Sequence, residues 1–216
     1  MARIRFITFE GGEGSGKSSH ARRLADWLKG QGREVVLTRE PGGTPGAEEI
    51  RKLLVQGEAA RWEPMTEALL HFAARRDHVT KVVQPALARG AWVISDRFAD
   101  STMAYQGYGH RLGAEAIDLL RRLVLGDFAP GLTLLFDVPA ALGLERAGTR
   151  NVAVAGADGR YESMGEAFHA RVRDGFLAIA RAEPERVAVI DSAQPMEAVA
   201  AAVAAALRAR YPGEIG

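Results

Sequence analysis

The sequence predicts an α/β protein of three layers, α/β/α, in which a parallel sheet of five strands lies between two layers of helices. Short apolar runs alternate along the chain with segments of helical periodicity. Apolar runs separated by helices are typical of a parallel sheet that is buried on both faces. The length of 216 residues suits one domain with a substantial core, so we expect residues 1–216 to fold as a single domain.

The elements follow one another from the first residues to the last. The predicted strands are apolar runs with few breaks, and they are 4–9, 34–38, 91–95, 132–137 and 186–191. The predicted helices carry apolar residues three or four positions apart, and they are 18–29, 46–56, 64–89, 114–126, 163–182 and 195–210. The segment 148–159 has no clear periodicity and is rich in Gly and Ala, which predicts a mobile flap over roughly residues 146–160.

Composition excludes several classes of protein. The 28 basic and 27 acidic residues leave a net charge of +1, so no global positive field exists and we expect no nucleic-acid partner. Cysteine is absent, which removes disulfides, thiolate nucleophiles and cysteine metal sites and fits a reducing cytosol. No signal peptide fits the first residues and no apolar run has membrane-spanning length. We therefore expect a cytoplasmic protein without a membrane partner.

A glycine-rich loop between the first strand and the first helix is the strongest motif. It fits the phosphate-binding pattern Gly-x4-Gly-Lys-Ser/Thr, and its residues are Gly11, Gly12, Glu13, Gly14, Ser15, Gly16, Lys17 and Ser18. Such a loop turns backbone N–H groups toward a phosphate, and the helix N-terminus adds its positive dipole end. Lys17 can reach the β- and γ-phosphates of ATP, and the Ser18 hydroxyl can join a Mg²⁺ shell. The loop predicts a fold of the P-loop NTPase type.

Charged residues follow the next two strands, at the edge where parallel sheets bind ligands. Arg39, before a Pro-Gly-Gly turn, suits a second phosphate, although a surface arginine fits there equally. Asp96 ends an apolar strand, the usual setting for a carboxylate that holds Mg²⁺. Asp137 competes for that role, but it can instead cap the helix that follows it. We favour Asp96 because its neighbour Arg97 indicates an anionic substrate.

Glu13 and the flap arginines complete the candidate site. A carboxylate beside a phosphate cradle suits a metal or a substrate hydroxyl, and its alternative is an exposed loop position. Arg146, Arg150 and Arg160 could close over a transferring phosphoryl group, or could form a solvated basic loop. No Asn-Lys-x-Asp motif occurs, which disfavours a GTPase. Arginines after two strands and in the flap, in addition to the phosphate-binding loop, suggest two phosphorylated ligands that meet end to end. This is the arrangement of a nucleotide kinase.

Three segments of the chain closely resemble thymidylate (dTMP) kinases of the bacterial type. They are 9–18, 38–44 and 96–107, with weaker matches at 135–139, 159–162 and 189–192. The resemblance implies that MgATP phosphorylates dTMP to dTDP, a step of dTTP biosynthesis, and that the protein is a homodimer. The nearest rivals are a deoxynucleoside kinase and a nucleotide sensor or regulatory ATPase without a monophosphate substrate.

The resemblance also implies roles for individual residues. Those that it assigns to dTMP are Glu13, Arg39, Phe72, Arg75, Arg76, Arg97, Thr102, Tyr105 and Gln106. Glu13 would lie near the sugar hydroxyl, and Arg39 and Arg97 would hold the dTMP phosphate. Thr102 would face the thymine edge, and Tyr105 would crowd the sugar 2′ position. Lys17 and Ser18 would serve ATP and Mg²⁺, Asp96 would organise the metal, and Ser192 and Ala193 would border the adenine.

Alternatives stay open at two places where the chain departs from the family pattern: the flap, where Gly159 stands in place of the Asp of the family's Asp-Arg-Phe/Ile-Glu motif, and the base-stacking helix. The loop interior has no arginine, so the flap is expected to supply the transition-state charge through Arg150 or Arg160, with Arg146 next. The family has an aromatic residue four positions before an arginine, on one helix face. His71 with Arg75 and Phe72 with Arg76 both have that spacing. The distance to the following Gln-Pro segment favours Arg75, whereas Phe72 is the better stacking ring.

Overall fold

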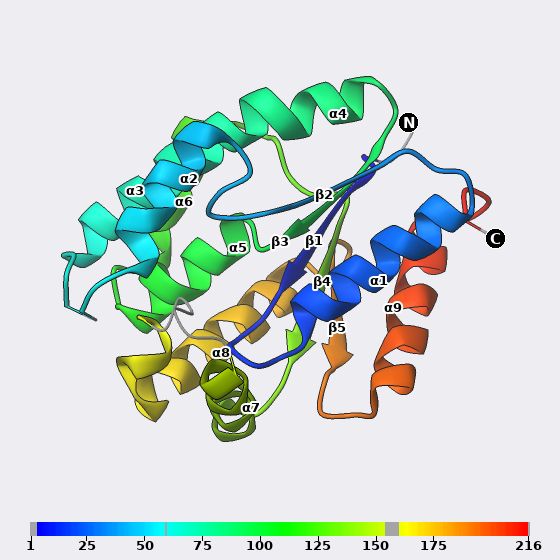
Figure 1. Ribbon diagram of the computed structural model, residues 1–216. Helices are drawn as coiled ribbons and strands as arrows, with labels where there is room; N and C mark the ends of the chain where they lie inside the picture. The colour runs from blue at the N-terminus through cyan, green and yellow to red at the C-terminus, as the bar shows by residue number, and fades with distance from the viewer. Residues whose placement is uncertain (1–3, 59, 154–159, 216) are drawn as a thin grey trace.

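The computed structural model describes residues 4–58, 60–153 and 160–215, with residues 150–153 described by their backbone alone. Within these ranges one sheet of five parallel strands forms the centre of the molecule, in the order β2-β3-β1-β4-β5 (Figure 1). The strands are β1 (Phe6–Glu10), β2 (Val35–Arg39), β3 (Trp92–Asp96), β4 (Leu132–Asp137) and β5 (Val187–Asp191). All five predicted strands are confirmed. Because β1 is central, the loop after it lies between the loops that follow β3 and β4.

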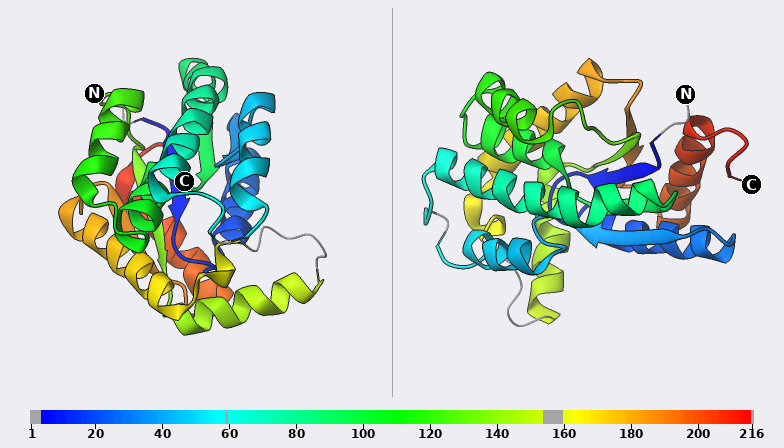
Figure 2. Two further views of the ribbon diagram at one scale, coloured as in Figure 1. Left: turned by 90° about the vertical axis from the view of Figure 1, so that its left-hand side faces the viewer. Right: turned by 90° about the horizontal axis from the view of Figure 1, so that it is seen from above.

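Helices cover both faces of the sheet (Figure 2). They are α1 (Lys17–Gly30), α2 (Pro45–Val55), α3 (Pro64–His78), α4 (Gln84–Ala88), α5 (Ala99–Thr102), α6 (Ala114–Leu125), α7 (Ala140–Ala153), α8 (Glu166–Ala182) and α9 (Met196–Arg210), with π-helical turns η1 (Val79–Val83) and η2 (Met103–Gly109) and a 3-10 turn η3 (Glu162–Met164). Side chains of β1 alternate between the two faces. Ile7 packs with Leu24 of α1 and Leu207 of α9, whereas Phe6 packs with Val83 of η1. The predicted three-layer α/β/α architecture is therefore confirmed.

The prediction of an irregular segment from Gly148 onward is wrong as far as Ala153, because α7 continues through these residues. Alanine is the best helix former, but a segment of small residues shows no apolar stripe that would reveal the helix in the sequence. Residues 154–159, the remainder of the predicted flap, lie outside the described residues.

The helical stretch formed by α5 and η2 was absent from the predicted elements. Most of its side chains are buried, and the buried ones are Ala99, Ser101, Thr102, Ala104, Tyr105 and Gln106. A helix that is buried nearly all round has no amphipathic pattern, so periodicity could not reveal it. This stretch places several of the predicted substrate residues.

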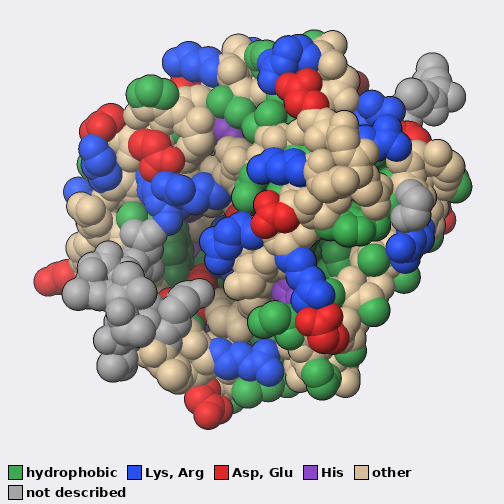
Figure 3. Space-filling model, turned by 45° about the vertical axis from the view of Figure 1, so that its right-hand side comes forward, with side chains coloured by type: hydrophobic (Ala, Val, Ile, Leu, Met, Phe, Trp, Pro, Cys, Tyr) green, Lys and Arg blue, Asp and Glu red, His purple; other side chains and the backbone are tan. Residues whose placement is uncertain are grey.

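Charged side chains of both signs are mixed on one face of the molecule. On the face shown in Figure 3, Lys and Arg side chains lie among Asp and Glu side chains, in keeping with a net charge of +1. Of the helices that the structure describes, none has both the length and the apolar composition that a membrane span needs.

Candidate active site

The glycine-rich loop connects the end of β1 to the start of α1 at Lys17. Gly11, Gly14 and Gly16 have φ angles of 138°, 64° and 82°, which glycine adopts without strain. The Lys17 side chain is buried, and its Nζ donates to the carbonyl oxygen of Gly12 at 2.9 Å. The loop thus curls around the ammonium group of its own lysine.

A cavity of about 380 Å³ lies beside this loop, a volume in the range of small-molecule sites. Many of the predicted site residues line it, and these are Glu13, Lys17, Ser18, Arg39, Asp96, Arg97, Thr102, Tyr105 and Gln106. They come from the glycine-rich loop, from the carboxyl ends of β2 and β3, and from the α5–η2 stretch. The topology therefore brings the three motif segments of the sequence to one cavity.

Arg97 is the centre of a polar network on the cavity wall. Its Nη2 donates to Glu13 Oε1 at 2.8 Å, and its Nη1 donates to the carbonyl of Gly11 at 3.1 Å and to Ser101 Oγ at 3.0 Å. The Tyr105 hydroxyl donates to the same Glu13 oxygen at 2.8 Å. Arg97 has a φ of 72°, a left-handed backbone that costs energy in a non-glycine residue and is often found at functional sites.

The Glu13 carboxylate is stabilised in its charged form. Burial raises its pKa, but the charges of Arg97 and Lys17 outweigh burial and hold the pKa at about 2, below the ordinary value of 4.5. A carboxyl whose folded-state pKa is lowered stabilises the fold fully above its unfolded pKa. That stability is lost as the pH falls from 4.5 toward 2.

We expect Glu13→Gln to flatten the acid dependence of stability. In the window from pH 4.5 to 2.5 the slope of the unfolding free energy should fall by up to about 1.4 kcal/mol per pH unit, the value for one proton. Urea unfolding at pH 4.5, 3.5 and 2.5 measures this slope, with Glu185→Gln at an exposed position as the control. Equal slopes for the two variants would show that Glu13 is not the group responsible.

Ser18 and Asp96 form the part of the site suited to a metal. Ser18 Oγ donates to Asp96 Oδ2, while the buried Asp96 Oδ1 has no hydrogen-bond partner among the described residues. A buried acceptor without a partner is costly, so this oxygen fits a cation. No group of three or more His, Cys, Asp or Glu side chains in the described ranges could hold a metal by itself. Mg²⁺ is usually bound by one or two carboxylates together with substrate phosphates, which suits Asp96 and Ser18.

Asp137, the competing carboxylate, is engaged elsewhere. Arg173 donates to both of its carboxylate oxygens, at 2.7 and 2.9 Å. Its backbone carbonyl accepts from the amide and the hydroxyl of Ser192.

Ser192 and Ala193 follow β5 and do not line the main cavity. The carbonyl of Ser192 accepts from Arg146 at 2.9 Å, so Arg146 connects α7 to this loop.

Arg39 lies at the rim of the cavity, half exposed. Its Nη2 donates to both carboxylate oxygens of Glu48, at 3.1 and 3.0 Å. An exposed ion pair contributes little to stability, so a ligand phosphate can compete for this arginine at small cost. Arg51 also lines the cavity and donates to the carbonyl of Pro41 at 2.9 Å. Sequence reasoning missed Arg51 because no motif marks it beyond its place in the helix after the Pro-Gly-Gly turn.

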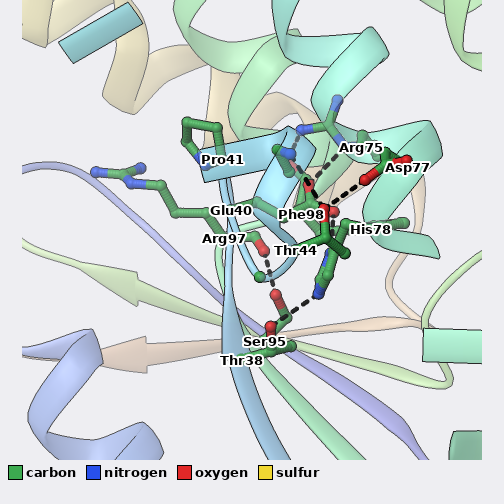
Figure 4. Close-up of polar contacts among 12 residues, drawn as sticks. Thr38, Glu40, Pro41, Thr44, Arg75, Asp77, His78, Ser95, Arg97 and Phe98 are labelled. Atoms are coloured by element: carbon green, nitrogen blue, oxygen red, sulfur yellow. Dashed lines mark hydrogen bonds and ion pairs between the residues drawn. The ribbon is translucent and has the colours of Figure 1, made fainter. Parts of the chain in front are cut away.

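Glu40, the residue directly after β2, contacts two basic side chains of α3 (Figure 4). Its Oε2 accepts from Arg75 Nε at 2.7 Å, and its Oε1 lies 2.8 Å from His78 Nδ1. The other ring nitrogen of His78 lies 2.8 Å from Thr38 Oγ1. Arg75 is fully buried and donates from Nη1 to Thr102 Oγ1 at 3.0 Å. Arg75 is thus held by Glu40 and reaches the cavity through Thr102, which lines it.

Phe72 and Arg76 do not line the cavity, which corrects their assignment to the substrate. The Phe72 ring is buried and packs against Ile117, with the Arg75 guanidinium 4.9 Å from its centre. Arg76 is exposed and donates to the carbonyl of Val124 at 3.2 Å.

His71 lines the cavity, so the aromatic–arginine pair on that helix face is His71 with Arg75. Its Nε2 lies 2.9 Å from the hydroxyl of Tyr161, another lining residue. Burial and the charge of Arg75 lower the pKa of His71 to about 3. The ring beside the cavity is therefore a neutral imidazole near neutral pH.

Arg160 does not face the cavity either, which corrects its assignment as a catalytic arginine. Its guanidinium is buried in an ion pair with Glu67 and donates to the carbonyls of Leu54 and Glu58 at 3.1 and 3.0 Å. Breaking such a buried pair is costly, so Arg160 anchors the chain to α2 and α3. The side chain of Arg150 lies outside the described residues, and its assignment stays a prediction.

A parallel α/β sheet with a phosphate-binding loop after its central strand, and arginines at the neighbouring strand ends, defines a phosphotransferase of the P-loop NTPase fold. The sequence profile of the thymidylate kinase family matches residues 9–203. The thymidylate kinase of Caulobacter vibrioides is 57% identical over 92% of this chain and 93% of that protein, and that of Thiobacillus denitrificans is 52% identical over 94% and 96%. The crystal structure of thymidylate kinase from Ehrlichia chaffeensis has a TM-score of 0.75 and 38% identity, covering 94% of this chain and 97% of that one. The chain belongs to the thymidylate kinase family.

Proposed function

We propose that this enzyme transfers the γ-phosphoryl group of ATP to dTMP by direct in-line displacement, giving dTDP for dTTP synthesis. Phosphorylation of dTMP with ATP and Mg²⁺ is the activity of the thymidylate kinase family, to which the chain belongs. One observation carries the assignment of residues: a single cavity joins the phosphate loop at Lys17 to Arg97 and Arg39. We propose that the whole chain works as one nucleoside monophosphate kinase domain.

The donor half of the reaction belongs to the glycine-rich loop. In the proposed mechanism Gly11 to Gly16 cradle the ATP phosphates, and Lys17 neutralises charge on the β- and γ-phosphates. Ser18 and Asp96 would hold Mg²⁺, which would neutralise negative charge on the ATP phosphates when bound. Ser192 and Ala193 would border the adenine beyond β5.

The acceptor half belongs to Arg97, Arg39 and their neighbours. In the proposed pose these arginines hold the dTMP phosphate, which is already anionic near neutral pH and needs no strong general base. Catalysis then depends on positioning and charge neutralisation. Arg150, with Arg146 next, is the flap candidate for stabilising the charge on the transferring group.

Residues of the α5–η2 stretch and of α3 would contact the sugar and the base of dTMP. Tyr105 and Glu13 would face the sugar, with Tyr105 disfavouring a 2′-hydroxyl. Gln106 Nε2 donates to Glu67 at 2.6 Å, and its buried Oε1 has no partner in the described part of the chain. This oxygen can accept from a donor on the ligand, beside Thr102 and the neutral ring of His71.

A coupled assay of ADP release tests the proposal with dTMP, dUMP, CMP, AMP and thymidine as acceptors. Release that depends on dTMP, with much weaker release for CMP, AMP and thymidine, is the expected result. Release with thymidine but not dTMP would indicate a nucleoside kinase. ADP binding without acceptor-dependent release would indicate a sensor or regulatory ATPase.

We expect Asp96→Asn to weaken metal use. The change removes the negative charge but keeps the shape of the side chain, so kcat should fall about 100-fold or more, in the range for losing one electrostatic contact in a transition state. The Mg²⁺ concentration at half-maximal rate should rise at the same time. Rates measured across Mg²⁺ concentrations check this, and an unchanged Mg²⁺ dependence would remove Asp96 from the metal site.

We propose that the enzyme is a homodimer in the cytoplasm, where its nucleotide substrates are available. Three leucines on the packed helices α3 and α6 are strongly exposed, Leu69 by 50%, Leu119 by 70% and Leu123 by 80%. Neighbouring exposed apolar side chains often mark a protein interface. A second copy of this chain would cover them.

Leu123→Glu is expected to shift the protein from dimer to monomer, because it places a charge in the apolar face that the second copy would cover. Sedimentation velocity of the wild type and the variant measures the change. Met196→Glu, at an exposed apolar position on α9, is the matched control. A wild-type protein that sediments as a monomer at all concentrations would contradict the dimer.

A further inference from the structure

Helix α7 touches the phosphate-binding loop through two glycines. A Cβ atom at Gly143 of α7 would lie 2.5 Å from the carbonyl oxygen of Glu13 and 3.3 Å from Val138 Cγ1. A Cβ at Gly14 of the loop would lie 2.0 Å from the carbonyl oxygen of Gly143. In both cases the nearest obstacle is backbone, which cannot rotate away as a side chain can. The two backbones therefore meet with no room for a side chain on either.

Only this contact requires a glycine at position 143. Gly14 has a φ of 64°, so its own backbone already favours glycine. Gly143 lies inside a helix, where glycine is the worst choice after proline. Gly148 of the same helix is exposed and has open space around it. Of the two glycines of α7, Gly143 therefore packs against the loop, whereas a Cβ atom at Gly148 would meet no atom of the described residues within 4 Å.

The contact links both halves of the active site. The backbone of Glu13 touches Gly143, while the Glu13 carboxylate accepts from Arg97 in the acceptor half of the cavity. Arg146 follows Gly143 by about one helical turn and donates to the loop after β5. A displacement of α7 would move these groups relative to Lys17, and a shift of about 1 Å can cost about 100-fold in rate.

We infer that Gly143 is a positioning residue for phosphoryl transfer, which sets the distance between helix α7 and the phosphate-binding loop through the backbone of Glu13. This inference rests on the proposed function. A methyl group at position 143 forces the helix and the loop apart. The loop then loses its fit to the nucleotide phosphates, Glu13 moves relative to Arg97, and Arg146 moves relative to the loop after β5.

The test compares Gly143→Ala with Gly148→Ala, the same substitution in the same helix. Gly143→Ala is expected to lower kcat about 10- to 100-fold and to weaken ADP binding about 10-fold, consistent with a shift below or near 1 Å. Its far-UV circular dichroism should match that of the wild type. Gly148→Ala is expected to retain wild-type kcat and ADP affinity and to raise Tm slightly, because alanine favours the helix.

Isothermal titration of ADP separates this inference from the proposed function, because it needs no acceptor. If the wild type fails to phosphorylate dTMP, the proposed function is wrong. The ADP affinities of the two variants would still test whether Gly143 positions the phosphate-binding loop. Equal kcat and ADP affinity in the two variants would overturn the inference. A Gly143→Ala protein that does not fold would also overturn it, because the contact would then serve the fold rather than the site.

Discussion

Replacing Lys17 with alanine is expected to reduce kcat for dTMP phosphorylation by about 1000-fold or more, the upper range for losing one preorganised charge in a transition state. Lys17 is buried at the first position of α1, beside the cavity, and its ammonium lies 2.9 Å from the carbonyl of Gly12. This places the charge inside the loop that would hold the β- and γ-phosphates. A charge at a water-poor position stabilises developing negative charge far more than the same charge in bulk water.

The control for Lys17 is Lys29→Ala, which removes an exposed lysine from the last turn of the same helix. This variant should retain wild-type kcat and KM. Steady-state kinetics with ADP detection, together with the Tm of each variant, separates loss of chemistry from loss of fold. Undiminished activity of a folded Lys17→Ala protein would overturn the whole functional assignment.

Arg97→Ala is expected to lower kcat/KM for dTMP by about 1000-fold, since a bound arginine on a phosphoryl group contributes that order of magnitude. Arg97 donates to Glu13, Ser101 and the carbonyl of Gly11, so its removal breaks these hydrogen bonds on the cavity wall. The Glu13 carboxylate, which is 15% exposed, would lose its main partner, and stability should fall by up to about 3 kcal/mol.

The measurement for Arg97 is kcat and KM for each substrate separately. KM for dTMP should rise and kcat should fall, whereas KM for ATP should change much less. Arg89→Ala, at an exposed ion pair with Glu34, serves as the control and should leave all three values unchanged. Wild-type kcat/KM for dTMP in the folded Arg97→Ala protein is incompatible with a role in binding the acceptor phosphate.

Residues whose roles depend on local sequence were predictable. The glycine-rich loop, Lys17 and Ser18 follow one another in the chain, and the strand before them and the helix after them are visible as apolar patterns. Asp96 and Arg97 were predictable because parallel strands all present their carboxyl ends at one edge of the sheet. The structure gathers these residues around one cavity, with Asp96 opposite Arg39 in the pairing of β3 with β2.

Residues whose roles depend on helix rotation were not predictable. His71 and Phe72 precede Arg75 and Arg76 at the same spacing, so the sequence leaves two registers of α3 open. Packing decides between them, because Phe72 fits into the apolar cluster with Ile117 while His71 meets Tyr161 at the cavity.

The sequence by itself determined the fold class, the phosphate-binding loop and the strand ends that carry the site, because each depends on neighbouring residues and on the period of a strand or helix. Only the tertiary structure decided that Arg160 is an anchor, since its partner Glu67 lies far away in the chain. Only the tertiary structure, too, showed that Gly143 meets the phosphate-binding loop. Contacts between distant segments depend on how whole helices pack, and no local pattern of residues records that packing.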